Sequence, residues 1–274
     1  MAKRTILITG CSSGIGYCSA HGMRKRGWRV LATVRHADDL ARLETEGLEA
    51  LHLDYTDPAS IAACAEEALD RTGGKLFALF NNGAYGQPGA VEDLTPDVLR
   101  AQFEANFFGW HDLTRRLIPA MRAGGQGRIV QCSSILGFIS PPFRGAYNAS
   151  KYALEALSDA MRYELAGSGI HVSLIEPGPI ASRFTEHALA ALEKNVDMAN
   201  SPHSAAYETR LAALRAGGTQ KFKLGPEAVL KKLIHAVESS RPEVRYYVTV
   251  PTYMAAIGKR VLPQSLIDAL VGRS

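Results

Sequence analysis

The segment from Thr5 to Gly27 constrains the fold more than any other stretch. It starts with the short β-rich run Thr5-Ile6-Leu7-Ile8-Thr9, which suits a buried parallel strand. A turn with three glycines follows, Gly10-Cys11-Ser12-Ser13-Gly14-Ile15-Gly16, and then a helix that should run to about Arg26 and stop at Gly27. The glycines would let the backbone approach a pyrophosphate, and the helix N-terminus would attract its charge. The spacing is not the usual Gly-x-Gly-x-x-Gly, but the strand–turn–helix context predicts a dinucleotide site. A tight turn without a ligand is the alternative.

Strand and helix patterns continue to alternate along the chain. Further strands are expected at 29–34, 48–53, 76–80, 128–132, 171–175 and 245–250. Helices are expected near 38–46, 58–71, 96–122, 147–165 and 226–239. This alternation is typical of an α/β fold with a doubly wound parallel sheet of the Rossmann type, in three αβα layers. The 274 residues, 46% of them apolar, fit a single domain over 1–274.

Two parts of the chain depart from this alternation. Residues 183–222 contain no β-rich run, so we expect a small lid that covers the ligand site, with helices near 183–198 and 205–215. The tail at 246–274 is rich in Tyr, Met, Leu and Val, with Lys259-Arg260 in its middle. It could lie on a membrane surface. We expect instead that it finishes the sheet and packs on the domain or on a second subunit.

The end of the second strand predicts which dinucleotide binds. Arg35-His36 follows this strand, and no Asp or Glu occupies positions 33–36. An acidic residue there would hold the ribose 2′-hydroxyl of NAD, whereas an arginine would accept the 2′-phosphate of NADP. Arg35 therefore favours NADP(H). An ordinary surface arginine at a strand end is the alternative.

Tyr147 and Lys151 form the candidate catalytic pair. They precede the run Tyr152-Ala153-Leu154-Glu155-Ala156-Leu157, whose apolar spacing is helical, so both should share one helix face. A lysine ammonium one turn away favours the phenolate and lowers the tyrosine pKa from about 10. The pair can then exchange a proton with a substrate oxygen near neutral pH. Alone the signal is weak, because Tyr-x-x-x-Lys occurs by chance in many helices.

Charge and cysteine spacing argue against several other classes of protein. The net charge of +4 is mild and no basic stripe favours nucleic acid. Cys11, Cys18, Cys64 and Cys132 form no C-x-x-C pair, and the eight histidines match no H-E-x-x-H motif. No metal site is therefore expected, and the thiols should be free and mostly buried. No run suits a signal-peptide core or a membrane span, so a soluble cytoplasmic protein is expected.

Several short motifs occur in a fixed order: Thr9-Gly10-x-x-x-Gly14-x-Gly16, Asp54, Asn81-Asn82-Gly83-Ala84, Asn106, Ser133-Ser134, Tyr147-x-x-x-Lys151 and Pro177-Gly178. In this order and spacing they are highly specific. With them, the chain closely resembles the short-chain dehydrogenases/reductases over nearly its whole length. The features Ala32-Thr33-Val34-Arg35 and Ser-Lys-Tyr-Ala-Leu-Glu-Ala at 150–156 look closest to one branch. It holds 17β-hydroxysteroid dehydrogenase type 1, retinol dehydrogenases and a bacterial NADP(H)-dependent aldehyde reductase.

The resemblance implies roles for individual residues. Ser134 would hold the substrate carbonyl oxygen, and Tyr147 would donate or accept the proton. Ser134 is preferred to Ser133 because it lies thirteen residues before Tyr147, the family's usual interval. Lys151 would lower the pKa of Tyr147 and bond the nicotinamide ribose, and Asn106 would anchor the water of a proton relay. The implied cofactor-binding residues are Gly10, Ser12, Ser13, Gly14, Ile15, Gly16, Arg35, Asp54, Tyr55, Asn82, Gly83, Tyr147, Lys151, Pro177, Gly178, Ile180 and Ser182.

Two departures from the family pattern are visible. Residues 81–84 read Asn-Asn-Gly-Ala where the family usually has Asn-Asn-Ala-Gly, and Ser182 stands where threonine is common. Cofactor binding is expected to survive both, since the residues stay small and the hydroxyl is kept.

The resemblance and the site together predict an oxidoreductase that interconverts a carbonyl and an alcohol by hydride transfer with NADP(H). An apolar substrate is expected from the residues near the site: Phe138, Ile139, Pro141, Pro142, Phe143 and Phe184. The resemblance also implies a homodimer or homotetramer built on helices around 100–122 and 147–165. Two alternatives are a regulatory protein that senses NADP(H) without turnover and an NAD-dependent enzyme. The four catalytic residues argue against the first and Arg35 against the second.

Overall fold

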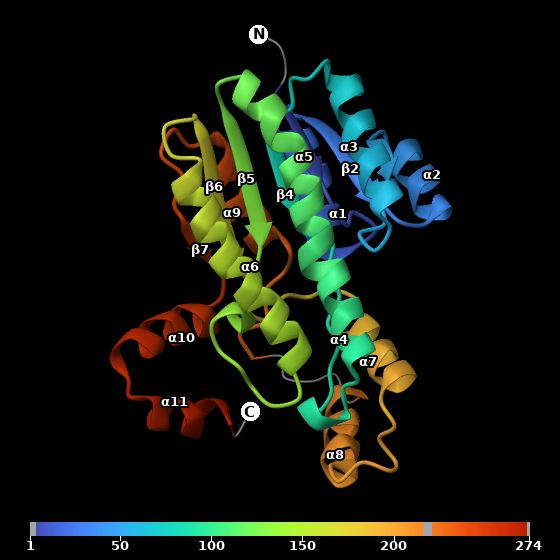
Figure 1. Ribbon diagram of the computed structural model, residues 1–274, viewed down its shortest axis with the longest axis vertical. Coiled ribbons are helices and arrows are strands. Elements are labelled where there is room, and N and C mark those ends of the chain that lie inside the picture. Colours follow the sequence, from blue (N-terminus) through green and yellow to red (C-terminus); the bar gives the residue numbers. More distant parts are fainter. Residues whose placement is uncertain (1–3, 216–220, 273–274) are drawn as a thin grey trace.

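A seven-stranded parallel sheet forms the centre of the molecule in the computed structural model, which describes residues 4–215 and 221–272 (Figure 1). The strand order is β3-β2-β1-β4-β5-β6-β7. The bounds are β1 (Thr5–Ile8), β2 (Arg29–Val34), β3 (Glu49–His52), β4 (Ala78–Asn81), β5 (Gly127–Cys132), β6 (Ile170–Glu176) and β7 (Arg245–Tyr247). The order reverses between β1 and β4, and open α/β sheets bind ligands at such a switch point. The prediction of a doubly wound parallel sheet is confirmed.

Helices cover both faces of this sheet. α1 (Gly14–Lys25) and α9 (Glu227–Glu238) pack together on one face, and α3 (Pro58–Thr72), α5 (Gly109–Ala123) and α6 (Gly145–Glu164) cover the other (Figure 1). α2 (Ala37–Thr45) packs on the edge strands β2 and β3. Strand residues such as Ile6, Leu7 and Phe80 are fully buried. Burial on both faces explains why the strands read as continuous apolar runs.

The predicted helix over 96–122 contains an irregular turn. α4 (Pro96–Phe103) passes into a π-helical segment, η2 (Glu104–Phe108), and then into α5. A π-turn takes in one extra residue, so it changes which side chains face inward, and such turns are frequent at functional sites. Asn106 lies within η2 and is fully buried.

The tail differs from its prediction. The strand expected at 245–250 ends at Tyr247, and α10 (Val250–Val261) starts three residues later. Pro251 explains the change, because proline cannot donate to a strand ladder and suits the first turn of a helix. β7 therefore finishes the sheet as expected, but the rest forms α10 and α11 (Gln264–Val271), and α11 buries no residue. No helix among the described residues is long and apolar enough to cross a membrane.

The segment predicted to be a lid, residues 183–222, contributes to a second, smaller hydrophobic core with the domain. Its helices α7 (Phe184–Asn195) and α8 (Ser204–Arg215) lie close to the predicted ranges, while residues 216–220 of the predicted lid lie outside the described residues. Leu192, Val196 and Tyr207 of the lid pack with Leu94 and Ala146 of the domain. The two ends of the lid meet, since Ala181 N donates to Leu224 O at 2.8 Å and Leu224 N to Pro179 O at 3.2 Å.

Candidate active site

The glycine turn after β1 brings the backbone of two loops into direct contact. Gly10 has φ +68°, and a Cβ placed there would lie 2.4 Å from Gly83 Cα. A Cβ on Gly16 would lie 2.2 Å from Gly10 O, and one on Gly14, with φ +57°, would lie 2.9 Å from Ser182 Cβ. The glycines therefore allow the loops after β1 and β4 to pack backbone against backbone.

The N-terminus of α1 follows directly on this glycine turn. Within the described residues, the Ser13 side chain makes no capping hydrogen bond, and the first turn of α1 contains no acidic residue. The first backbone N–H groups of a helix have no intrahelical acceptor and attract anions. The turn and the helix N-terminus thus suit a dinucleotide pyrophosphate, with Ser12, Ser13 and Ile15 at the turn.

Arg35 and Asp54 lie at the ends of neighbouring strands β2 and β3. Arg35 is exposed, and its Nη2 lies 3.4 Å from His36 Nε2. Burial raises the pKa of Asp54, but hydrogen bonds from the backbone and hydroxyl of Thr56, at 2.9 and 2.8 Å, hold it below its ordinary value. The Tyr55 side chain turns inward, where its hydroxyl donates to Asn81 Oδ1 at 2.8 Å. Because the Tyr55 ring points inward, only the backbone of Tyr55 is available to the predicted cofactor site.

The departure at 81–84 has a simple structural consequence. Asn82 N and Gly83 N both donate to Thr9 Oγ1, at 2.8 and 3.1 Å, which fixes the loop after β4 against β1. A Cβ on Gly83 would lie 3.2 Å from both Cα and N of Gly10, so an alanine would crowd that backbone by a few tenths of an ångström. Glycine at position 83 avoids this contact, and the expectation that cofactor binding survives the change stays a prediction.

Tyr147 and Lys151 lie buried on one face of α6, as their spacing predicts. Tyr147 is 8% exposed and Lys151 is 1% exposed. Lys151 Nζ donates to Cys132 O at 2.8 Å and lies 4.1 Å from the centre of the Trp110 ring. Ser134, at the end of β5, accepts a hydrogen bond from Leu136 N at 3.1 Å, and its hydroxyl helps to lower the pKa of Tyr147. The structure therefore brings together the three groups that the sequence places in separate motifs.

The charges around Tyr147 differ from the sequence expectation. Burial raises the pKa of Tyr147 strongly, and the nearby Cys132 thiol adds to the shift. The groups that lower the pKa are Ser134 and Arg144. Lys151 is not among them, because burial lowers the pKa of Lys151 itself to about 8, against the opposing effects of Cys132 and Glu155. The proposed influence of Lys151 on Tyr147 stays a prediction.

The buried ammonium should make stability depend on pH. The Lys151 pKa falls from 10.5 to about 8 on folding, so the unfolded chain binds more protons between these values and stability rises with pH across that window. Below pH 8, burial of the charged Lys151 ammonium lowers the free energy of unfolding by about 3 kcal/mol, at 1.36 kcal/mol per pKa unit. We expect Lys151→Met to raise the free energy of unfolding at pH 7 and to lose that advantage near pH 10. Denaturant unfolding at both pH values checks this, with the exposed Lys75→Met as control. If the stability gained by Lys151→Met were the same at both pH values, the lowered pKa of Lys151 would be contradicted.

Asn106 links the π-turn to the loop after β4. Its Oδ1 accepts from Tyr85 N at 3.2 Å and its Nδ2 donates to Tyr85 O at 2.8 Å. Nδ2 also lies 3.5 Å from Ser150 Oγ on α6. Asn106 thus ties three elements around the site, and a water would have to use the remaining acceptor capacity of its amide oxygen.

The segment after β6 contacts the Ser134 loop, the glycine turn and the base of the lid. Pro177 O accepts a hydrogen bond from Ile135 N at 2.8 Å, which joins this segment to the Ser134 loop. Gly178 packs against Thr249, because a Cβ there would lie 2.1 Å from Thr249 Oγ1. Ile180 pairs with Leu224 at the base of the lid, and Ser182 faces Gly14.

The aromatic residues expected to line the substrate side divide into two groups. Phe184, at the start of α7, packs edge-on against Tyr147 with 5.3 Å between ring centres. Phe143 also lies at the lid, 5.2 Å from the Tyr207 ring. Phe138 instead packs against Tyr247 at 6.2 Å, behind α6. The expectation for Phe138 is wrong, because the short helix η3 (Ile135–Gly137) turns the chain toward β7.

Buried charges behind α6 are the part of the site that the sequence did not reveal. Arg245 Nη2 lies 2.7 Å from Asp159 Oδ2 and 3.2 Å from Glu155 Oε2, and Arg245 Nε lies 3.2 Å from Glu176 Oε1. Burial, with the neighbouring Glu155 carboxyl, raises the pKa of Glu176 to about 8. Glu155 lies one turn after Lys151, and this spacing is the sequence signal that could have revealed the cluster. The Glu155 carboxylate adds negative charge behind Lys151 and favours its ammonium form.

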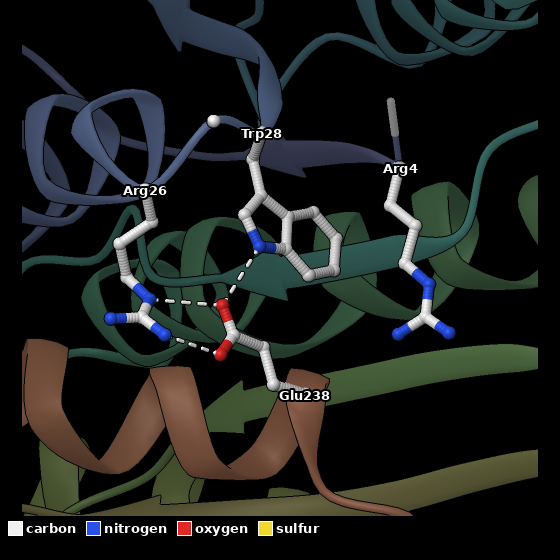
Figure 2. A pocket seen from close by; sticks show the side chains of 5 residues that line it. Arg4, Arg26, Trp28 and Glu238 are labelled. Atoms are coloured by element: carbon white, nitrogen blue, oxygen red, sulfur yellow. Dashed lines mark hydrogen bonds and ion pairs between the residues drawn. The ribbon is translucent and has the colours of Figure 1, made fainter. Parts of the chain in front are cut away.

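A hollow at the opposite end of the sheet does not belong to the site (Figure 2). This cavity of about 330 Å³ is lined by Arg4, Arg26, Gly27, Trp28 and Glu238. Glu238 already accepts from Arg26 Nε at 2.9 Å, Arg26 Nη2 at 2.6 Å and Trp28 Nε1 at 3.0 Å. These bonds join the end of α1 to the end of α9, so the cluster stabilises the fold.

The family follows from comparison with known proteins. Residues 4–193 match the family model described as short chain dehydrogenase. The chain belongs to the short-chain dehydrogenase family. It is 44% identical to "Uncharacterized oxidoreductase YbbO" of Escherichia coli (strain K12) over 269 residues, which covers 98% of this chain and 94% of that protein. Human "Retinol dehydrogenase 8" is 33% identical, with 89% of this chain and 81% of that protein covered. Human "17-beta-hydroxysteroid dehydrogenase type 1" is 31% identical, with 91% and 78% covered. The resemblance seen in the motifs is confirmed.

Solved structures of the family share the same fold. A short-chain dehydrogenase from Streptomyces avermitilis has a TM-score of 0.82 at 30% identity and covers 98% of this chain and 95% of that one. A family member from Burkholderia phymatum in complex with NAD has a TM-score of 0.78 at 26% identity, with 99% and 96% covered. One from Sphingobium yanoikuyae in complex with NADPH has a TM-score of 0.71 at 25% identity, with 97% and 95% covered. Both dinucleotides therefore occur among proteins of this fold.

Proposed function

We propose that this short-chain dehydrogenase is an NADP(H)-dependent oxidoreductase that interconverts an apolar aldehyde or ketone and its alcohol. The observation that carries the proposal is the convergence of Ser134, Tyr147 and Lys151 at the carboxyl edge of the sheet, the edge at which the glycine turn also lies. A nicotinamide cofactor, when bound, supplies or accepts the hydride. The residues of the chain supply position, a proton and support for the carbonyl oxygen.

The residues of the proposed site have distinct roles. The Ser134 hydroxyl holds the carbonyl oxygen beside the Tyr147 phenol, which gives up or takes the proton. Lys151, buried with one backbone acceptor at Cys132 O, has N–H donors left for the nicotinamide ribose. Asn106 holds the loop at Tyr85 and anchors a relay water. Phe184 covers the Tyr147 ring and keeps bulk water from the reacting atoms.

The proposed cofactor preference rests on Arg35. Its exposed guanidinium follows β2 at the position that faces the adenosine ribose in this fold, and no carboxylate stands at 33–36. The NAD complex from Burkholderia phymatum shows why the preference needs a direct test.

Reversal of the charge at position 35 tests that preference. We expect Arg35→Asp to weaken NADPH binding about 100-fold, through lost pairing with the 2′-phosphate and repulsion by the new carboxylate. NADH binding in the same variant should change less than about threefold and serves as the internal control. Fluorescence titration of both reduced dinucleotides gives the dissociation constants. An unchanged preference would mean that another group holds the 2′-phosphate.

A panel of carbonyls tests the activity as a whole. Purified protein is mixed with NADPH, and separately with NADH, and the absorbance of the reduced cofactor is followed with short and long aliphatic aldehydes, aromatic aldehydes, retinal and a 17-ketosteroid. Turnover with NADPH on one class supports the proposal. Binding of NADPH without turnover on any carbonyl would favour the alternative, a protein that senses NADP(H).

We propose a cytoplasmic homodimer or homotetramer built on α5 and α6. Phe108, the last residue of η2 before α5, is 50% exposed, and Tyr163, near the end of α6, is 69% exposed. Light scattering of the purified chain gives the mass of the assembly, and a monomer would contradict this part of the proposal.

A further inference from the structure

The guanidinium of Arg245, on β7, contacts more carboxylates than it can neutralise. Its Nη2 lies 2.7 Å from Asp159 Oδ2 and 3.2 Å from Glu155 Oε2, and its Nε lies 3.2 Å from Glu176 Oε1. Asp159 has a second cation, since Arg162 Nη2 lies 3.2 Å from its Oδ1. The side chains of Glu155 and Glu176 are 11% and 1% exposed, so water stabilises a second negative charge there poorly. Arg245 is therefore shared by two buried carboxyl groups, of which it can balance only one.

The remaining charged groups around Glu176 do not balance the second carboxyl. Lys259, on α10, donates to the Tyr152 hydroxyl at 3.2 Å. Arg260 is exposed, and its charge acts on Glu176 less strongly than Arg245 does. The charged and titratable groups that line the cavity of about 320 Å³ behind α6, or that contact Arg245, come from three elements: Glu155, Asp159 and Tyr152 on α6, Arg245 and Tyr247 on β7, and Lys259 and Arg260 on α10.

A proton on Glu176 would restore the balance. Burial, with the Glu155 carboxyl next, raises the pKa of Glu176 to about 8 against the opposing charge of Arg245, and the two carboxyl groups lie close enough for a hydrogen bond. Within the described residues, neither oxygen of Glu176 has a hydrogen-bond partner, and Glu155 Oε1 has none. Ionised carboxylates only accept hydrogen bonds, whereas a protonated carboxyl can donate one. Glu176 would thus donate to Glu155, which stays ionised beside Arg245.

The carboxyl pair lies directly behind the proposed site. Gly137 leaves room for it, because a Cβ there would lie 2.7 Å from Ser133 Oγ and 3.2 Å from Glu155 Oε1. Ile135 N donates to Pro177 O at 2.8 Å, so the loop after β5 is bound to the segment after β6. Three residues of this region each adjoin a residue of the proposed site: Ser133 precedes Ser134, Glu155 follows Lys151 by one turn, and Glu176 precedes Pro177.

We propose that Glu155 and Glu176 are positioning residues: they share one proton and, as a bonded pair, keep the Ser134 loop, α6 and the segment after β6 aligned for the reaction. This inference rests on the proposed function, which assigns these three segments to catalysis and cofactor binding. Loss of the shared proton would leave two repelling carboxylates between the segments and loosen their contacts. The alignment should therefore fail as the pH rises through about 8.

Infrared spectroscopy detects the shared proton without substrate or cofactor. At about pH 6 exposed carboxyl groups are ionised, so the carbonyl stretch of a protonated carboxyl reports a buried one. We expect this band in the wild type, where it should titrate near pH 8, and not in Glu176→Gln. Glu155→Gln should move the titration at least about one pH unit lower, since Arg245 then balances a single carboxyl. The exposed Glu164→Gln on the same helix is the control and should keep the band. A wild type without the band, or a band that survives in Glu176→Gln, overturns the shared proton.

Hydrogen exchange measures the alignment itself, again without turnover. The Ile135 amide is protected by its bond to Pro177 O. After correction for the intrinsic pH dependence of exchange, its protection in the wild type should fall about tenfold between pH 8 and pH 9, as expected for loss of one proton. In Glu176→Gln, whose amide donates at every pH, the protection should persist. Protection that falls equally in both proteins would show that the pair does not hold the loop.

The pH dependence of kcat tests the role in the reaction. With one carbonyl and saturating NADPH, log kcat above pH 8 should fall more steeply in the wild type than in Glu176→Gln, by about one unit per pH unit, because the wild type has one more proton to lose. Titration of Lys151 is common to both proteins and cancels in this difference. Equal slopes overturn the positioning role even if both proteins are active. If no carbonyl is turned over, the proposed function fails, and infrared and exchange still decide the carboxyl pair. The wild-type titration and Glu155→Gln decide it if Glu176→Gln does not fold.

Discussion

Tyr147→Phe is expected to lower kcat about 1000-fold, within the range that general acid–base catalysis supplies. Phenylalanine keeps the ring that packs against Phe184 at 5.3 Å but has no proton to give. Affinity for NADPH should change less than about threefold, because the bond from Leu136 N to Ser134 Oγ and the bond from Lys151 Nζ to Cys132 O do not involve the Tyr147 hydroxyl. Absorbance of the reduced cofactor gives the rate, and fluorescence titration gives the affinity.

Tyr152→Phe is the matched control on the same helix. Tyr152 lines the space behind α6, where its hydroxyl accepts from Lys259 Nζ at 3.2 Å, away from Ser134. Its removal should leave kcat within about twofold of wild type. If Tyr147→Phe turned over near the wild-type rate, the phenol would not be the proton donor and the mechanism would have to use another acid.

Gly10→Ala is expected to disrupt both the fold and the cofactor groove. The new Cβ would lie 2.4 Å from Gly83 Cα, and neither backbone can move without breaking the bonds that Thr9 makes to the loop after β4. The positive φ adds strain to this overlap. We expect a loss of about 3 kcal/mol in the free energy of unfolding, and NADPH affinity reduced at least about tenfold.

Gly73→Ala is the control that separates the backbone strain of a positive φ from the steric overlap expected at Gly10. Gly73 has φ +57° at the end of α3, and a Cβ there would meet nothing within 4 Å. Its replacement should cost about 1 kcal/mol and leave cofactor binding intact. Denaturant unfolding with and without NADPH measures both effects. If Gly10→Ala and Gly73→Ala lost equal amounts of unfolding free energy and NADPH affinity, the contact between Gly10 and Gly83 would not be needed for cofactor binding.

Much of the fold could be predicted because its signals are local. Strand and helix patterns alternate over short windows, and the predicted ends mostly agree with the structure within two or three residues. The exceptions have local causes that outweigh the pattern. Pro251 starts α10 where the β-rich run suggests that β7 continues. The sequence pattern did not reveal the π-turn at Glu104–Phe108, because its side chains repeat nearly as in an α-helix.

The sequence alone determined the Rossmann-type sheet, the glycine turn and the pairing of Tyr147 with Lys151, because each depends on residues a few positions apart. Only the tertiary structure decided which charges meet around that pair. Arg245 joins Glu155 and Glu176 behind α6, and residues 201–207 of the lid bind Glu92 and Asp93. These partners lie far apart in the chain, and packing brings them together. Burial then sets their charge, since the cost of removing an ion from water depends on every group that surrounds it.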